Sequence, residues 1–194
     1  MFAHVAGSAA ERRKALARGR IVHRLMQSLP DIPEAGRKAA IGRYLKNTAA
    51  DFLPAEQAEM AQQILAILND LIFAEMFAPG SRAEVPIVGR ISRAGAVPIA
   101  VSGQVDRLAV TADSVLIADY KTDRAVPREL GEVRPYVAQL ALYRAVLARV
   151  YPNKTIRAAL LFTAGPSFID VPGAAMDAEL AEIIRLNQGE LTLR

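Results

Sequence analysis

The sequence contains no cysteine, and this absence narrows the kinds of site that the protein can carry. Without cysteine there are no disulfide bonds, no thiolate zinc sites and no cysteine-ligated iron–sulfur clusters. Any metal ion must therefore be held by oxygen atoms or by imidazole. Tryptophan is also absent and only 6% of the residues are aromatic, which leaves few side chains that can stack on exposed nucleic-acid bases.

Long apolar runs are missing as well. The most apolar stretch, residues 64–78, is interrupted by Asn69, Asp70 and Glu75, and it falls short of the ~20 nearly uncharged residues that a membrane span needs. The N-terminus has no uninterrupted apolar segment of the kind found in secretion signals. We therefore expect a cytoplasmic protein that makes no contact with a membrane.

The charged residues do not form long runs of one sign. The net charge is +4, and the Lys and Arg residues are scattered along the chain. Such a charge is compatible with a polyanionic partner but does not prove one. The pattern G-x-x-x-x-G-K-S/T does not occur in the 194 residues, so they contain no phosphate-binding loop of an ATP-driven motor.

The apolar content of 52% is enough for one domain with a buried core. Helical spacing of apolar residues predicts helices over 11–29, 34–49, from Pro54 to about Phe77, over 131–150 and from Asp177 to Asn187. Alternating patterns predict strands over 82–91, 97–110, 114–121 and 155–163, and a short edge strand over 167–171. The short loops between the first three strands suit antiparallel hairpins.

The segment VLIADYKTDR, residues 115–124, ends an apolar run with an acid and a base two positions apart. Side chains alternate between the two faces of a strand, so Asp119 and Lys121 project to the same side and Tyr120 points away. On the preceding strand, Asp106 follows an alternating pattern and is expected near the strand end. Asp106 is therefore predicted to lie beside the end of the next strand, which carries Asp119 and Lys121.

A tight turn between these strands is expected to bring Asp106 and Asp119 close to each other. Two carboxylates at short distance repel, and one of them holds a proton unless a cation neutralises the pair. A divalent cation is the simplest neutraliser. The alternative for Asp119 and Lys121 is an ordinary solvated ion pair, worth under about 1 kcal/mol.

These residues belong to an ordered set of motifs that resembles the RecB-type branch of the PD-(D/E)XK nucleases. The resemblance covers roughly residues 15–165 and is closest to the C-terminal nuclease domain of the AddA helicase–nucleases of bacterial double-strand-break repair. The motifs are Gly19-x-x-x-His23, Glu84, Gly103 to Leu108 (GQVDRL), Ile117 to Thr122 (IADYKT) and Gln139-x-x-x-Tyr143.

The resemblance implies a restriction-endonuclease-like α/β fold with a mixed central sheet flanked by helices. Residues 1–80 are then an N-terminal helical segment that carries the Gly-x-x-x-His motif, and residues 81–194 are the nuclease core, the two together forming one structural domain. The implied activity is that of a Mg²⁺- or Mn²⁺-dependent deoxyribonuclease of the exonuclease type. DNA, a fused helicase domain and a second, AddB-like subunit are the implied partners.

By the same resemblance His23, Asp106 and Asp119 are metal ligands, joined by the backbone carbonyl of Tyr120, and Lys121 is the catalytic lysine. Phosphodiester hydrolysis needs an activated water and stabilisation of the charge on the phosphoryl oxygens, both of which a carboxylate-held cation supplies. Lys121 adds a point charge beside the reacting groups. For His23 the alternative is a histidine that only packs in the helix face.

Further residues of the set have less specific roles. Glu84 is expected to help the metal or to orient a water, with an ion pair to Arg82 or Arg107 as the alternative. Gln139 and Tyr143 lie one helical turn apart and share a face, which the resemblance places over the active site, in contact with DNA or bracing Lys121.

Core packing is the alternative for Tyr143. Arg124, just beyond the third strand, is a candidate phosphate contact, with simple solvation of a loop arginine as the alternative.

Two other functions stay open at the level of sequence. One is a nuclease-like module that has lost catalysis and serves in DNA binding or subunit docking, although the intact Asp106, Asp119 and Lys121 argue against it. The other is a stand-alone exonuclease of the same superfamily. Val105 stands where the family name has proline, which the RecB-type branch commonly lacks, and the absence of cysteine favours the AddA-like type over relatives with an iron–sulfur cluster.

Overall fold

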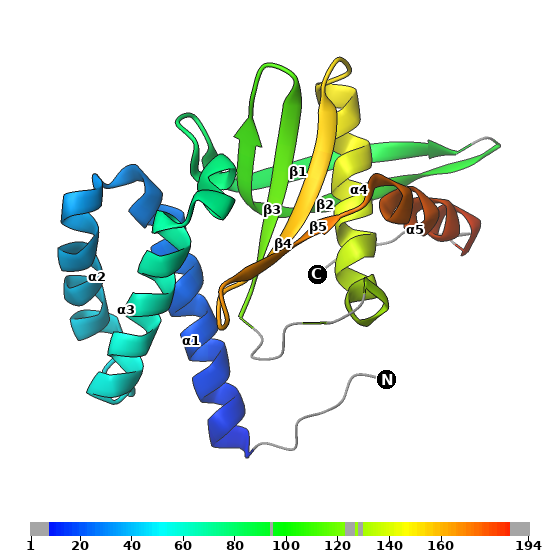
Figure 1. Ribbon diagram of the computed structural model, residues 1–194. Helices are drawn as coiled ribbons and strands as arrows, with labels where there is room; N and C mark the ends of the chain where they lie inside the picture. The colour runs from blue at the N-terminus through cyan, green and yellow to red at the C-terminus, as the bar shows by residue number, and fades with distance from the viewer. Residues whose placement is uncertain (1–7, 94, 123–126, 128–129, 187–194) are drawn as a thin grey trace.

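A mixed sheet with helices on both faces organises the chain (Figure 1). The computed structural model describes residues 8–93, 95–122, 127 and 130–186. Within these residues the sheet has five strands in the order β1-β2-β3-β4-β5. The mixed sheet and flanking helices that the sequence predicts are therefore confirmed.

The N-terminal part is helical, and its first two helices agree closely with the predicted ranges. Its elements are α1 (Ala9–Ser28), the 3₁₀ turn η1 (Leu29–Asp31), α2 (Glu34–Thr48), α3 (Pro54–Asn69) and the 3₁₀ helix η2 (Leu71–Phe77). The start of α1 is fixed by a capping box, in which the Ser8 side chain accepts the Glu11 N–H and the Glu11 carboxylate accepts the Ser8 N–H.

The third predicted helix, Pro54 to Phe77, is wrong in its last third. The α-helix ends at Asn69 because Asp70 adopts an extended conformation and its carboxylate accepts the Ile72 N–H. Aspartate competes in this way for backbone donors and so favours caps and turns over helix interiors. The chain then continues as η2 in a new direction.

Strand pairing explains the layout of the sheet. The strands are β1 (Arg82–Arg93), β2 (Ala96–Val110), β3 (Ser114–Lys121), β4 (Thr155–Phe162) and β5 (Ser167–Val171). Neighbours pair antiparallel except β3 and β4, which are parallel. The parallel pair is connected through η3 (Leu130–Val133) and α4 (Arg134–Val150), as a parallel crossover requires.

The last helix, α5, runs over Gly173–Leu186, so it begins earlier than the predicted Asp177. Its predicted last residue, Asn187, lies outside the described residues. Figure 1 shows α4 and α5 on one side of the sheet and α1, α2 and α3 toward the other.

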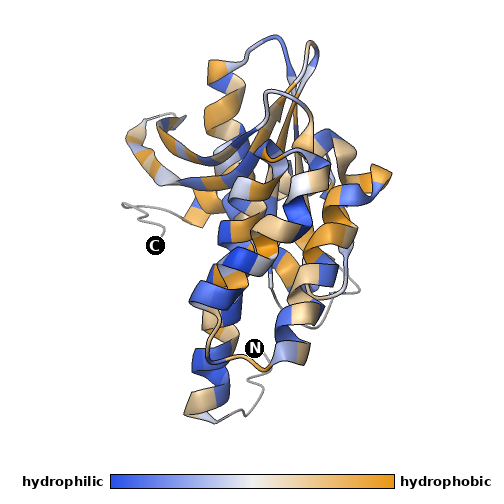
Figure 2. Ribbon diagram, turned by 90° about the vertical axis from the view of Figure 1, so that its left-hand side faces the viewer, coloured by the Kyte–Doolittle hydropathy of each residue, from blue (hydrophilic) through white to orange (hydrophobic). Residues whose placement is uncertain are grey.

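Each face of the sheet has its own apolar core. Strand β3 shows how the sequence builds both, because Val115 and Ile117 pack against the core with α4 and α5, whereas Leu116, Ala118 and Tyr120 pack against the core with α1, α2 and α3. Along the helices, hydrophilic residues alternate with the hydrophobic ones that face these cores (Figure 2). The alternation also confirms that the Tyr120 side chain points away from the face of Val115 and Ile117.

Strand β2 ends at Val110, as predicted, and Asp106 lies four residues before that end. The last four residues of β2 pair with β3, from Arg107 opposite Ala118 to Val110 opposite Val115. Asp106 is the residue at which this ladder stops while the pairing of β2 with β1 goes on. The position still places its side chain beside the end of β3.

None of the described helices is by itself long and apolar enough to cross a membrane. The bent pair of α3 and η2, which meet at 82°, meets the length and composition criteria only when the two are taken together.

Gly103 of β2 lies directly beneath the Tyr143 side chain of α4. A Cβ atom at this position would lie 2.0 Å from the Tyr143 hydroxyl oxygen. The same hydroxyl accepts the backbone N–H of Gln104 at 3.3 Å. The glycine of the GQVDRL motif is thus required by the helix that covers it.

We expect Gly103→Ala to lower the free energy of unfolding by about 1–3 kcal/mol, because the added methyl group overlaps the Tyr143 ring. Gly42→Ala in α2 is the matched control, since a Cβ there meets nothing within 4 Å. The control is expected to gain about 0.5–1 kcal/mol from the better helix propensity of alanine. Urea unfolding followed by circular dichroism measures both, and an unchanged stability of Gly103→Ala contradicts the close packing.

Candidate metal centre

Three potential metal ligands from three different elements come together beside the end of β3. His23 of α1, Glu84 of β1 and Asp106 of β2 each offer one ligand atom, and these atoms lie within 4.8 Å of one another. Imidazole nitrogen and carboxylate oxygen suit a divalent cation. The donor set also meets the requirement, set by the lack of cysteine, that a metal be held by oxygen and imidazole.

Gly19 explains why His23 reaches this place. A Cβ atom on Gly19 would lie 3.1 Å from the Thr122 hydroxyl oxygen, so the missing side chain lets α1 pack tightly against the chain that follows β3. One helical turn later, His23 Nε2 lies 3.1 Å from the Tyr120 carbonyl oxygen. The four-residue spacing of the Gly-x-x-x-His motif therefore sets the helix distance and the histidine position together.

His23 also faces Asp106, with its Nδ1 atom 3.6 Å from Asp106 Oδ1. The pKa of His23 is raised, chiefly by this interaction with the Asp106 carboxylate, although burial opposes the rise. The second oxygen of Asp106, Oδ2, accepts the backbone N–H of Tyr120 at 2.6 Å. Asp106 thus connects β2 to the end of β3 with one oxygen and presents the other to His23.

Glu84 has an unusual backbone. Its φ angle is +54°, the single positive value at a non-glycine residue in the part of the chain that the structure describes. It sits between the ladder pairs Ala83–Arg107 and Val85–Val105, opposite Asp106. Left-handed conformations of such residues cost of order 1–2 kcal/mol and concentrate at functional sites.

The carboxylate of Glu84 is not neutralised by the arginines that the sequence suggested. Arg107 instead donates to the Ser81 hydroxyl and lies near Asp31, and no ion pair of Glu84 with Arg82 or Arg107 occurs among the described residues. Burial raises the pKa of the Glu84 carboxyl and the charge of Asp106 raises it further. Two carboxylates that repel each other in this way fit a cation between them.

Asp119 and Lys121 project to one face at the end of β3, as predicted. The Lys121 ammonium contacts Asp119 Oδ2, and the two side chains are only 14% and 10% exposed. Burial raises the pKa of Asp119, and the charge of Lys121 opposes that rise. An ion pair this buried differs from the solvated surface pair that was the alternative. Asp119 does not belong to the three-residue group above, so its role as a metal ligand stays a prediction.

Gln139 and Tyr143 form one hydrogen-bonded unit on α4. The Gln139 amide donates to the Tyr143 hydroxyl at 3.0 Å, and that hydroxyl accepts the Gln104 N–H from the strand that carries Asp106. Tyr143 is 2% exposed, which agrees with core packing. Arg124, the candidate phosphate contact, lies outside the described residues.

Sequence reasoning missed Tyr136. Its ring lies 3.7 Å from the Lys121 ammonium, a distance at which the face of an aromatic ring attracts a cation. Tyr136 precedes Gln139 by three residues on α4 and therefore shares its helix face. The sequence signal that could have identified Tyr136 is its spacing, because it lies one helical turn before Gln139 on the face shared with Tyr143.

We expect Mn²⁺ to raise the melting temperature of the protein, because binding at 100 times the dissociation constant stabilises a folded state by about 2.7 kcal/mol. His23→Ala and Glu84→Gln are expected to require more Mn²⁺ for the same shift, since each removes one ligand atom of the group. Glu34→Gln, an exposed glutamate at the start of α2, is the control with the same charge change. Equal shifts in all variants, measured by differential scanning fluorimetry, contradict a metal site at this group.

Comparison with known proteins shows which family the chain resembles. The chain matches the family model of the PD-(D/E)XK nuclease superfamily over residues 2–188, whereas curated protein sequences give no match. A solved structure described as the crystal structure of SSO0001 is similar over 94% of this chain and 88% of that chain, with 13% sequence identity and a TM-score of 0.35.

The family match spans nearly the whole chain and the mixed sheet flanked by helices agrees with a restriction-endonuclease-like fold. The protein therefore belongs to the PD-(D/E)XK nuclease superfamily.

Proposed function

We propose that the protein is a metal-dependent nuclease that hydrolyses phosphodiester bonds of DNA. The observation that carries the proposal is the convergence of His23, Glu84 and Asp106 beside the strand end with Asp119 and Lys121. Such a group of acids next to one buried lysine is costly to fold, because the carboxylates repel and burial disfavours their charge. The chain belongs to a nuclease superfamily, and phosphodiester hydrolysis is a reason to keep residues that lower the stability of the fold.

Mg²⁺ or Mn²⁺ is the proposed cofactor, with His23, Asp106, Asp119 and the Tyr120 carbonyl as ligands and Glu84 as an additional one. A bound cation would lower the pKa of a coordinated water and act as a Lewis acid toward the phosphate. The Tyr120 carbonyl oxygen already faces His23 Nε2. Asp106 attaches the same residue to β2 by accepting the Tyr120 N–H.

Lys121 is the proposed catalytic residue that balances charge on the phosphate. Its ammonium contacts Asp119 on one side and the ring of Tyr136 on another, so the side chain is oriented before substrate binds. A positioned cation of this kind stabilises developing negative charge without reorganisation. Gln139 is proposed as a further residue of the same catalytic site, because it shares the helix face of Tyr136 and is hydrogen-bonded to Tyr143.

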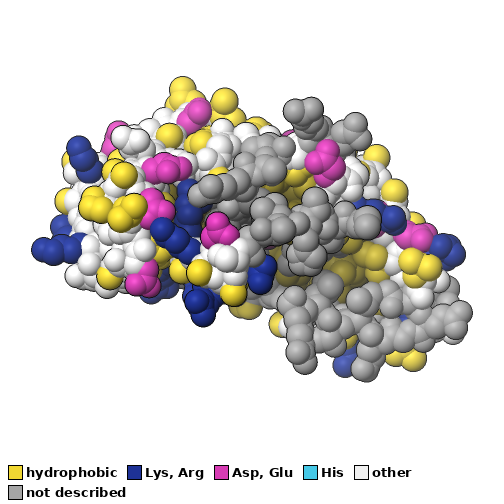
Figure 3. Space-filling model, turned by 90° about the horizontal axis from the view of Figure 1, so that it is seen from below, with side chains coloured by type: hydrophobic (Ala, Val, Ile, Leu, Met, Phe, Trp, Pro, Cys, Tyr) yellow, Lys and Arg dark blue, Asp and Glu magenta, His cyan; other side chains and the backbone are white. Residues whose placement is uncertain are grey.

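We further propose an AddA-like role, in which this chain is the exonuclease part of a helicase–nuclease in double-strand-break repair. The order and spacing of the motifs support it, as does the lack of cysteine. On the face seen in Figure 3, Lys and Arg side chains are interspersed with Asp and Glu side chains. Weak electrostatic attraction for DNA fits a nuclease to which a motor and an AddB-like subunit deliver the strand.

The nuclease proposal predicts that Lys121→Met lowers the rate of DNA cleavage by about 10²-fold or more, because the positioned charge is lost. Methionine is unbranched and of similar length but uncharged, so the substitution removes the ammonium that contacts Asp119 and Tyr136. Lys38→Met on α2, where the lysine is exposed, is the matched control. The measurement is digestion of end-labelled single-stranded and duplex DNA with Mg²⁺.

Cleavage by Lys121→Met at the rate of the control rejects Lys121 as the catalytic lysine. A wild-type protein that binds DNA but cleaves none with Mg²⁺ or Mn²⁺ supports the inactive DNA-binding or docking module instead.

The helicase-appended proposal predicts slow cleavage by this chain alone and a preference for single strands or frayed ends. The rate is expected to fall steeply between about 50 and 200 mM salt, because phosphate contacts by Lys and Arg weaken as counterions accumulate. Initial rates on single-stranded and blunt duplex DNA, measured without ATP over this salt range, test it. Fast cleavage of blunt duplex at physiological salt favours a stand-alone exonuclease of the same superfamily.

A further inference from the structure

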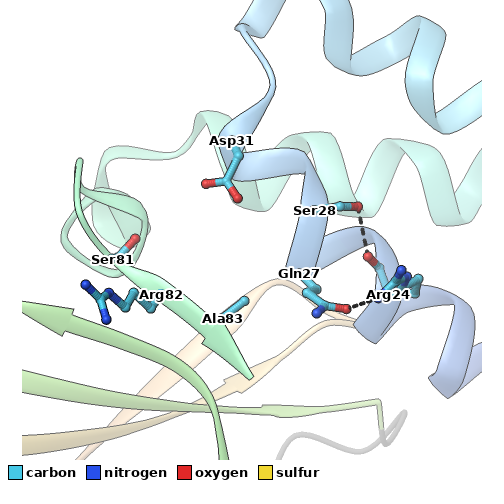
Figure 4. Close-up of a pocket in the computed structure, with 7 residues that line it drawn as sticks. All are labelled: Arg24, Gln27, Ser28, Asp31, Ser81, Arg82 and Ala83. Carbon is cyan, nitrogen blue, oxygen red and sulfur yellow. Dashed lines mark hydrogen bonds between the residues drawn. The ribbon is translucent and has the colours of Figure 1, made fainter. Parts of the chain in front are cut away.

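A polar pocket of about 520 Å³ opens between the last turns of α1 and the start of β1. Figure 4 shows the residues that line it, which are Arg24, Gln27, Ser28, Asp31, Ser81, Arg82 and Ala83. Its volume falls in the range of ligand-binding clefts. Nearly all of the lining side chains are polar or charged, and none is aromatic, so the pocket suits an ionic group rather than a stacked base.

Two of the residues that line the pocket are sequence neighbours of residues in the candidate metal centre. Arg24 follows His23 on α1, and Ala83 precedes Glu84 on β1. Gln27 lies one helical turn beyond His23 and hence on the same helix face. A ligand that extends from the metal centre along α1 and β1 therefore meets the pocket next.

Positive charge predominates around the pocket. Arg24 and Arg82 are exposed at its rim. Arg24 Nη1 donates to the Gln27 side-chain oxygen at 2.6 Å, which holds its guanidinium beside the pocket. Arg24 also acts on the metal centre, because its charge and that of His23 partly offset the rise in the pKa of Glu84 caused by burial and by Asp106.

The one carboxylate of the lining, Asp31, is offset by a guanidinium behind it. Arg107 Nη2 lies 3.8 Å from Asp31 Oδ1. Arg107 is 2% exposed, donates to the pocket residue Ser81 through Nε and Nη2, and has no hydrogen-bond partner for Nη1 in the described structure. Three guanidinium groups thus lie at or behind a pocket whose lining contains one acid.

We infer that this pocket binds a backbone phosphate of the nucleic-acid strand adjacent to the phosphate at the metal centre, with Arg24 and Arg82 as its phosphate contacts. The inference rests on the proposed nuclease function. Phosphates recur along a strand at roughly 3.4 Å of helix axis, so a strand with one phosphate at His23, Glu84 and Asp106 carries the next ones past the neighbouring residues of α1 and β1. Arginine forks match phosphate oxygens in charge and geometry. The pocket then fixes the register of the strand without reading its sequence.

The test measures binding separately from cleavage. Fluorescence anisotropy of a labelled single-stranded DNA in EDTA, over a series of salt concentrations, gives the affinity and the slope of its logarithm against the logarithm of salt. Arg24→Gln and Arg82→Gln are each expected to weaken binding several-fold and to reduce the slope by about 0.7–1. Arg43→Gln, at an exposed arginine of α2 that does not line the pocket, changes the net charge equally and is expected to leave the slope near the wild-type value.

Pocket variants that bind with the affinity and slope of Arg43→Gln overturn the inference, whether or not the wild type cleaves DNA. A wild-type protein that binds no DNA at any salt concentration overturns it as well. Weakened binding of both pocket variants together with a wild type that fails to cleave with Mg²⁺ or Mn²⁺ supports the phosphate pocket and rejects the nuclease proposal.

Discussion

The hydrogen bond from the Tyr120 N–H to the Asp106 carboxylate is the contact on which the site geometry depends. The backbone ladder between β2 and β3 ends at Arg107 and Ala118, so the last residues of β3 need another attachment to β2. Asp106 supplies it with one oxygen. Tyr120 is thereby attached to β2 through its N–H, and its carbonyl oxygen lies 3.1 Å from His23 Nε2. The Asp119 and Lys121 side chains lie on the face of the strand opposite to the Tyr120 side chain.

Electrostatic cost and function are coupled in this arrangement. Burial and mutual repulsion disfavour the charged forms of Glu84 and Asp119, and the left-handed backbone of Glu84 adds conformational strain. A sequence selected for stability alone would replace such groups by apolar residues of similar size. The two apolar cores on either side of the sheet supply the burial that offsets these costs.

Local patterns predicted the sheet, the helices and the shared face of Asp119 and Lys121, because strand and helix periods depend only on neighbouring residues. The early end of α3 escaped prediction because the Asp70 cap competes with helix propensity over a single residue. The contact of Tyr136 with Lys121, the placement of Glu84 rather than Asp119 within the three-ligand group, and the buried position of Arg107 depend on how α4, β1 and β2 pack. No periodic pattern in the sequence signals such contacts between distant segments.

The backbone conformation of Glu84 also affects whether the edge of the sheet can pair with a strand of another molecule. Strand β1 is an outer strand of the sheet, and a regular outer strand offers a row of unpaired donors and acceptors to any other extended chain. The left-handed turn at Glu84 interrupts that row, and Pro86, two residues on, lacks an N–H donor altogether. The conformation that brings Glu84 to the candidate metal centre thereby also protects the sheet edge against intermolecular strand pairing and aggregation.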